Sequence, residues 1–96
     1  MTTYMVFGLK NITDEAGLRD YQAVGFESLQ GRNFKLIAGP AGATTLEGTD
    51  FEPFVILEFP TRAEAEDWYH SEKYQKAKAI RERCAETFGL MVDANG

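Results

Sequence analysis

The segment Phe54–Ala65 reads FVILEFPTRAEA and decides the fold, because a strand ends and a helix begins inside it. Residues 54–59 are apolar except for Glu58, which predicts a buried strand. Pro60 ends this strand, and Thr61 followed by Glu64 has the pattern of a capping box, in which side-chain oxygens bind the free N–H groups of a helix start. We therefore expect a helix to begin at Thr61.

We expect the helix that follows to be built in two parts. Ala65, Trp68 and Tyr69 are predicted to point to the core, with Trp68 anchoring the first part against the sheet. Ser71 followed by Glu72 is typical of a new helix start, so a kink or restart is expected there. Beyond it, helical spacing relates Tyr74, Ala77, Ile80, Cys84 and Phe88.

Working toward the N-terminus, the chain predicts a strand, a helix and a second strand. Tyr4–Leu9 is apolar on both alternating faces, which suits a central strand. Thr13 or Asp14 can cap a helix that runs to about Gln30, where Gly31 suits the stop. The inner face of this helix is predicted to carry Leu18, Tyr21, Gly25 and Leu29, with Gln22 and Phe26 at its border. Gly25 could permit close packing of this helix.

Asn33–Ala38 alternates between apolar and polar residues, as expected for a strand with one wetter side. The segment from Gly39 to Pro53 is long for a hairpin, although Thr44–Glu47 could resume the strand after a bulge or turn at 39–42. We expect a broken strand and a mobile loop here. A last strand is predicted over Thr87–Val92.

The order strand, helix, strand, strand, helix, strand predicts an α+β, ferredoxin-like fold: a four-stranded antiparallel sheet with two helices on one face. At 96 residues we expect one domain, 1–96. The strands 4–9 and 54–59 are apolar on both sides, whereas two helices cover one face only. A second copy of the chain is the simplest cover for the other face, so we predict a homodimer with its two sheets face to face.

Composition limits the class of protein. A net charge of −5 repels polyanions, so neither nucleic acid nor an anionic membrane surface is an expected partner. No apolar run approaches the roughly 18 residues that a membrane-spanning helix requires. The first residues lack a signal-peptide pattern and the single Cys84 cannot form an internal disulfide, so we expect a cytoplasmic protein.

Several of these residues together resemble a bacterial family known as domain of unknown function 1330. The likeness spans nearly the whole chain, and it rests on Phe59-Pro60-Thr61, on Trp68-Tyr69-x-Ser71-x-x-Tyr74-Gln75 with Arg81 after it, and on Leu46-Glu47-Gly48. It implies the dimeric α/β-barrel architecture, in which two ferredoxin-like chains pair. It implies no particular chemistry.

His70 and Glu58 are the candidate catalytic residues. Helical spacing places His70 on one side with Glu66 and Tyr74, where a proton could be held. The more common role is that of an exposed histidine at a helix end. If Val55, Leu57 and Phe59 pack on the helices, Glu58 points between the sheets, where burial would suit it to general acid–base work. The more common alternative is a strand-end carboxylate that reaches solvent or pairs with Lys35.

Trp68, Tyr69 and Arg81 are the candidate ligand-binding residues. Trp68 and Tyr69 could line a pocket together with Tyr74, although aromatic residues in this position more often form the core. The planar guanidinium of Arg81 could bind a carboxylate, including that of Glu47. We place the expected cleft at the corner after the strand 54–59, bordered by Glu58, Trp68, Tyr69, His70 and Arg81.

The sequence supports three functional hypotheses. The first is a homodimeric protein that binds a small organic molecule, and the second is a cofactor-free monooxygenase- or isomerase-like enzyme that acts on an apolar or aromatic metabolite. The third is a structural or regulatory dimer with a filled interior. We expect no metal, because no His/Cys cluster is present, and no cofactor, because nothing in the sequence indicates one. Gly39–Gly42 is not a phosphate-binding loop, since it lacks the Lys-Ser/Thr ending and a following helix.

Overall fold

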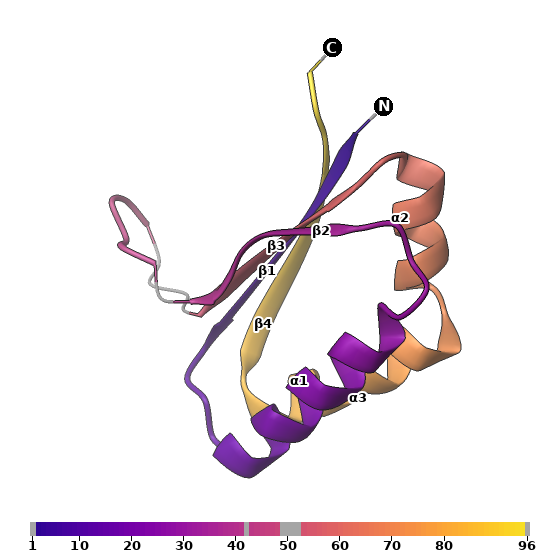
Figure 1. Cartoon of the computed structure of the whole chain (residues 1–96). Helices are drawn as coiled ribbons and strands as arrows, with labels where there is room; N and C mark the ends of the chain where they lie inside the picture. Colours follow the sequence, from indigo (N-terminus) through magenta and orange to yellow (C-terminus); the bar gives the residue numbers. More distant parts are fainter. Residues whose placement is uncertain (1, 42, 49–52, 96) are drawn as a thin grey trace.

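Antiparallel pairing joins four strands into one sheet in the order β2-β3-β1-β4, with the helices packed on one face (Figure 1). The structure, a computed structural model, describes residues 2–41, 43–48 and 53–95. The elements in chain order are β1 (Thr3–Lys10), α1 (Glu15–Ser28), β2 (Lys35–Ala41), β3 (Phe54–Phe59), α2 (Arg62–Tyr69), α3 (Glu72–Cys84) and β4 (Glu86–Asp93). The predicted ferredoxin-like α+β fold is confirmed, with β1 and β3 as the central strands.

Two side-chain caps set the path of the chain after β3. Thr61 Oγ1 accepts a hydrogen bond from the N–H of Glu64 at 3.2 Å, which starts α2 as the capping box predicts. Ser71 Oγ accepts from the N–H of Tyr74 at 3.2 Å and donates to the carbonyl of Trp68 at 2.6 Å. The same hydroxyl therefore closes α2 and opens α3, and the predicted restart is confirmed.

The side chains of β1 alternate between the two faces of the sheet. Met5 and Phe7 point to the helices and are buried, whereas Tyr4 and Val6 lie on the other face and are half-buried. Two cross-strand pairs between β1 and β4 follow the same alternation: Phe7 lies opposite Gly89, and Gly8 lies opposite Phe88. In each pair the ring covers the glycine, since a Cβ on Gly89 would lie 3.0 Å from the Phe7 ring and one on Gly8 would lie 2.3 Å from the Phe88 ring.

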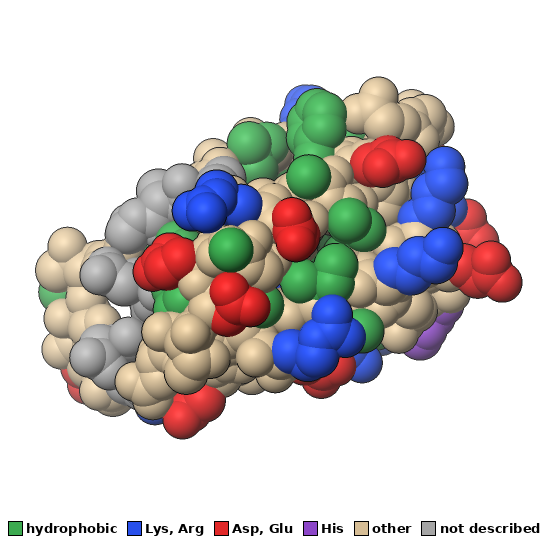
Figure 2. All heavy atoms as spheres, turned by 90° about the horizontal axis from the view of Figure 1, so that it is seen from below, with side chains coloured by type: hydrophobic (Ala, Val, Ile, Leu, Met, Phe, Trp, Pro, Cys, Tyr) green, Lys and Arg blue, Asp and Glu red, His purple; other side chains and the backbone are tan. Residues whose placement is uncertain are grey.

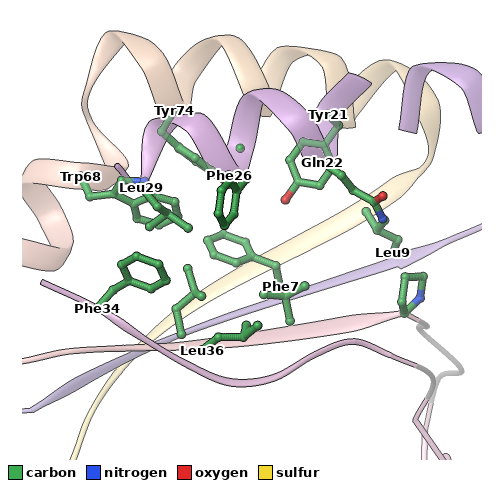
Figure 3. A pocket seen from close by; sticks show the side chains of 14 residues that line it. Phe7, Leu9, Tyr21, Gln22, Phe26, Leu29, Phe34, Leu36, Trp68 and Tyr74 are labelled. Atoms are coloured by element: carbon green, nitrogen blue, oxygen red, sulfur yellow. The ribbon is translucent and has the colours of Figure 1, made fainter. Parts of the chain in front are cut away.

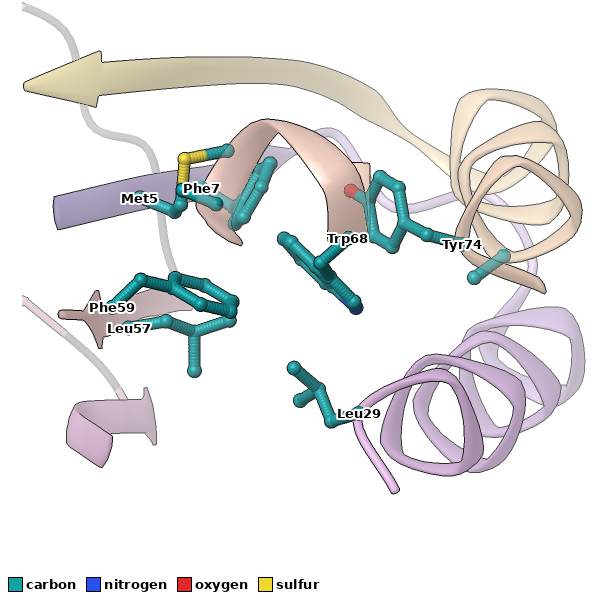
Figure 4. Close-up of a cluster of buried hydrophobic side chains, with 9 residues drawn as sticks. Met5, Phe7, Leu29, Leu57, Phe59, Trp68 and Tyr74 are labelled. Atoms are coloured by element: carbon teal, nitrogen blue, oxygen red, sulfur yellow. The ribbon is translucent and has the colours of Figure 1, made fainter. Parts of the chain in front are cut away.

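Trp68 occupies the centre of the core between α2, the sheet and α3 (Figure 4). Its ring centroid lies 5.4 Å from that of Phe59 and 4.3 Å from that of Tyr74. The indole N–H donates to the Oγ of Ser28, at the end of α1, at 3.1 Å. The predicted role of Trp68 as the anchor of this helix is therefore confirmed.

Two boundaries differ from the sequence prediction. The helix α1 ends at Ser28 rather than near Gln30, because the N–H groups of Leu29 and Gln30 turn back to carbonyls three residues earlier in a tighter final turn. The strand β2 runs on to Ala41 through a bulge. Ala41 already pairs with Phe54, the first residue of β3, so residues 44–47 have no strand partner there and form no strand. Part of the expected mobile loop, residues 42 and 49–52, lies outside the described residues.

The helix α1 packs along α3, and a glycine makes the approach possible at one end. A Cβ on Gly17 would lie 2.6 Å from the Sγ of Cys84 and 2.7 Å from a carboxylate oxygen of Asp14. A Cβ on Gly25 would meet its nearest atoms, in Tyr21 and Ala77, at 3.8 and 4.0 Å, which is ordinary contact. The close packing expected at Gly25 is thus found at Gly17 instead.

These two glycines give a matched prediction. Gly25→Ala should raise the free energy of unfolding by about 0.5–1 kcal/mol, because alanine favours a helix and the added methyl group finds space. Gly17→Ala should lower it by about 1–3 kcal/mol, because the methyl group would overlap Cys84 and Asp14. Urea unfolding of both variants measures the difference, and equal effects of the two substitutions would contradict this account of the α1–α3 contact.

Candidate functional site

A cavity of about 320 Å³ lies between α1 and the sheet (Figure 3). Figure 3 shows side chains from the helix and from the strands that point toward each other across this space. The cavity is lined by Phe7, Leu9, Tyr21, Gln22, Gly25, Phe26, Leu29, Phe34, Leu36, Pro53, Val55, Leu57, Trp68 and Tyr74. It combines the core side of the central strands with the inner face of α1.

The cavity opens to solvent beside two exposed apolar side chains. Phe26 on α1 is 65% exposed and Leu36 on β2 is 54% exposed, although both line the cavity. Deeper in, the wall is formed by Trp68 and Tyr74, which are 2% and 1% exposed. The space therefore runs from an apolar mouth at the edge of the sheet to an aromatic floor in the core.

Few polar groups face this apolar space. Among the lining residues, polar side-chain atoms come from Tyr21, Gln22, Trp68 and Tyr74. The indole N–H of Trp68 is already bound to Ser28, and Gln22 is exposed at the surface of α1. A cavity of this kind suits a mainly apolar molecule that makes a small number of polar contacts.

At the aromatic floor, Tyr74 forms a buried polar pair with Arg81, which does not line the cavity. The Nη1 of Arg81 donates to the hydroxyl oxygen of Tyr74 at 2.9 Å, and Arg81 is 3% exposed. Its guanidinium carbon lies 5.0 Å from the ring centroid of Phe7 and 5.9 Å from that of Tyr21. Burial raises the pKa of the Tyr74 hydroxyl well above its usual value, and the Arg81 charge opposes this only in part.

The candidate ligand-binding residues do not all meet at the cavity. Trp68 lines it, whereas Arg81 lies behind Tyr74 and makes no contact with Glu47 among the described interactions. Tyr69 is half-buried outside the cavity, with its ring 5.2 Å from that of Tyr74 and 5.7 Å from the Nζ of Lys78.

His70 lies in solvent at the C-terminal end of α2. Its backbone N–H donates to the carbonyl of Glu66, and its ring packs edge-on against Tyr69 at 5.2 Å. The side chains expected beside it are used elsewhere, because the Glu66 carboxylate binds Arg62 at 3.0 Å and the Tyr74 hydroxyl binds Arg81. His70 thus has the location of the exposed helix-end histidine that was the alternative expectation.

Glu58 lies on the sheet face that points away from the helices, as expected when Leu57 and Phe59 are buried. Its carboxylate lies 3.9 Å from the Nζ of Lys35, which is the alternative pairing that the sequence suggested. Of the five residues expected at one cleft, Glu58, Trp68, Tyr69, His70 and Arg81, only Trp68 lines this cavity. A proton-transfer role for Glu58 or His70 stays a prediction.

The cavity also includes residues that the sequence reasoning did not select as a site. Tyr21, Gln22 and Phe26 all come from α1, where we predicted Tyr21 on the inner face and Gln22 and Phe26 at its border. The available signal was the placement of Phe26 at the border of the apolar stripe, where a large aromatic side chain is left without a core position. The pocket role considered for Tyr74 agrees with its place in the cavity wall.

Other kinds of site find little support in the part of the chain that the structure describes. No group of three or more His, Cys, Asp or Glu side chains could hold a metal ion there. None of the described helices has the length and apolar composition needed to cross a membrane. Acidic and basic side chains are interspersed on the face shown in Figure 2, which does not form the continuous basic surface typical of nucleic-acid binding.

Comparisons with known proteins agree with this fold. The family model described as domain of unknown function 1330 matches residues 2–95. A comparison with curated proteins gives no match.

Solved structures similar to this chain include a protein of unknown function from Rhodopseudomonas palustris, at 16% identity and a TM-score of 0.67, over 99% of this chain and 83% of that one. A dimeric ferredoxin-like protein of unknown function from Jannaschia sp. CCS1 has 14% identity and a TM-score of 0.69, over 98% and 100%. An antibiotic biosynthesis monooxygenase has 14% identity and a TM-score of 0.58, over 100% of both chains. At these identities the likeness shows the fold.

The buried Tyr74 hydroxyl predicts a loss of stability at high pH. Because its pKa is raised in the folded state, the folded protein keeps a proton that the unfolded chain releases above about pH 10. The stabilisation is present below that pH, and above it the free energy of unfolding should fall by up to about 1.4 kcal/mol per pH unit for this one group. Urea unfolding between pH 8 and 11 measures the slope, and Tyr74→Phe should make it shallower. An unchanged slope in that variant would contradict the assignment.

Proposed function

This chain belongs to the family described as domain of unknown function 1330, and we propose that it is a homodimeric protein that binds a small, mainly apolar organic molecule. The observation that carries the proposal is the cavity of about 320 Å³ between α1 and the sheet. Its size and its apolar, aromatic lining are typical of small-molecule sites. A protein with a purely structural role would be expected to fill this space with side chains.

The location of the cavity also favours binding. A ligand that covers Phe26 and Leu36 at the mouth would remove exposed apolar surface from water, at about 25 cal/mol per Å². The floor is held by Trp68 and its hydrogen bond to Ser28, so that the binding surface exists before a ligand arrives. Both features supply affinity without a large rearrangement.

The homodimer is supported by the sheet face that the helices leave open. Val6, Phe54 and Ile56 are half-buried on this face, and Leu90 and Val92 on β4 are 53% and 46% exposed. A second copy of the same face would cover them, since a two-fold axis brings identical patches together. The similar protein from Jannaschia sp. CCS1 is described as dimeric, which agrees with this arrangement.

An enzymatic function has less support from the geometry. A cofactor-free monooxygenase- or isomerase-like reaction in this cavity would need an acid–base group at its wall. Glu58 and His70, the candidates from the sequence, lie outside the cavity. The fold likeness to an antibiotic biosynthesis monooxygenase does not supply such a group.

Binding can be tested with a neutral fluorescent probe, N-phenyl-1-naphthylamine. We expect saturable binding of one probe per chain, and we expect Val55→Phe to weaken it at least about tenfold, which is about 1.4 kcal/mol, because the larger ring fills part of the cavity. Leu46→Phe is the control, since it adds the same ring at a loop side chain that is 88% exposed and does not line the cavity. Equal affinities of the two variants, or no saturable binding by the unchanged protein, would refute the proposed site.

The dimer can be tested by sedimentation at micromolar concentration, where the mass should be twice the 10.7 kDa of one chain. Ile56→Asp should dissociate or unfold the dimer, because it places a carboxylate in the centre of the open face. Leu46→Asp makes a comparable change at a side chain that is 88% exposed in a loop, and it should leave the mass unchanged. A single-chain mass for the unchanged protein would rule out this assembly.

A further inference from the structure

We propose that the hydroxyl of Tyr74, held by the buried guanidinium of Arg81, donates a hydrogen bond to an oxygen atom of the ligand. This inference rests on the proposed binding function and narrows it to a chemical class. The ligand would be a mainly apolar molecule that carries a carbonyl or anionic oxygen, with that oxygen placed at the floor of the cavity. Tyr74 would be the contacting residue, and Arg81 would act through it as a positioning residue.

Arg81 is a buried cation without an acidic partner among the described residues. It is 3% exposed, and its one hydrogen bond among the described interactions goes to Tyr74. Its Nε is buried and has no hydrogen-bond partner. The ring faces of Phe7 and Tyr21 offset part of the lost hydration, but no described carboxylate lies within ion-pair distance. A buried charge in this state is costly unless something nearby carries negative charge.

The hydroxyl of Tyr74 can both accept and donate a hydrogen bond. The oxygen accepts from Arg81, so the proton must point elsewhere, and no described group accepts it. Tyr74 lines the cavity, with its ring packed against Trp68 and Phe7, which line it as well. Because burial raises the pKa of this hydroxyl, the group remains protonated near neutral pH. It is thus a buried hydrogen-bond donor without an acceptor among the described groups, on a residue that lines the cavity.

The positive charge of Arg81 also makes the Tyr74 hydroxyl a stronger donor. A guanidinium bound to the hydroxyl oxygen withdraws electron density from the O–H bond and strengthens it as a donor. In an apolar cavity this effect is larger than in water, because the surroundings screen charge weakly. The best acceptor is an oxygen with negative or partial negative charge, as in preorganised sites that stabilise oxyanions.

Two naphthalene derivatives of nearly equal shape test the inference. 2-Acetylnaphthalene carries a carbonyl oxygen where 2-isopropenylnaphthalene carries a methylene group. We expect the ketone to bind about tenfold more tightly, which corresponds to one charge-assisted hydrogen bond. We also expect the infrared carbonyl band of the bound ketone to lie at lower wavenumber than the band of the same ketone in hexane.

The variants separate the role of Tyr74 from a structural effect. Tyr74→Phe should abolish the preference for the ketone and the band shift, while the affinity for the hydrocarbon stays within about twofold, a small effect on the free-energy scale. Arg81→Met should reduce the band shift while Tyr74 remains. Tyr4→Phe removes a hydroxyl from the opposite sheet face, and it should change neither readout.

The outcomes distinguish this inference from the proposed function. If both probes bind equally well and the carbonyl band does not move, the cavity binds apolar molecules but the role of Tyr74 is wrong. If Tyr21→Phe rather than Tyr74→Phe removes the preference, the donor is the other tyrosine of the cavity and the assignment is also wrong. If neither probe binds, the proposed function and the inference fail together.

Discussion

The indole of Trp68 connects α2 to most of the structure. It stacks on Phe59 of β3, meets Phe7 of β1 edge-on, and contacts Tyr74 at the start of α3. Its N–H reaches Ser28, at the end of α1. One side chain therefore fixes the position of α1, of α3 and of the two central strands relative to each other, and losing it would loosen all of them at once.

This connection explains why a cavity persists beside a packed core. The helix α1 is held at its N-terminal end, where Gly17 lies against Cys84, and at its C-terminal end, where Ser28 binds Trp68. Because a helix is stiff, the segment between these points spans the sheet without settling on it, and Tyr21 and Phe26 face the space that is left. The cavity thus follows from the two end contacts of α1.

The sequence predicted the parts of the fold that depend on local patterns. Short runs that are apolar on both faces predicted the central strands, and the caps at Thr61 and Ser71 were predicted from side chains that bond within three residues. The cavity could not be predicted, since it depends on the separation of α1 from the sheet and hence on the long-range contact between Ser28 and Trp68. For the same reason Glu58 was assigned to the correct face of the sheet, but to a cleft that does not coincide with the cavity.

The reciprocal pairs Phe7–Gly89 and Gly8–Phe88 help to select the register in which β1 and β4 pair during folding. The strands β1 and β4 are far apart in the sequence, so bringing them together costs much chain entropy and is slow. Each ring lies over a glycine, and both rings do so in only one register. A shift of β4 by two residues would leave every side chain on the same sheet face, but it would place both rings opposite residues with larger side chains. The two pairs therefore favour one register of β4 on β1. They also disfavour pairing of this edge strand with other strands, including a strand from another chain.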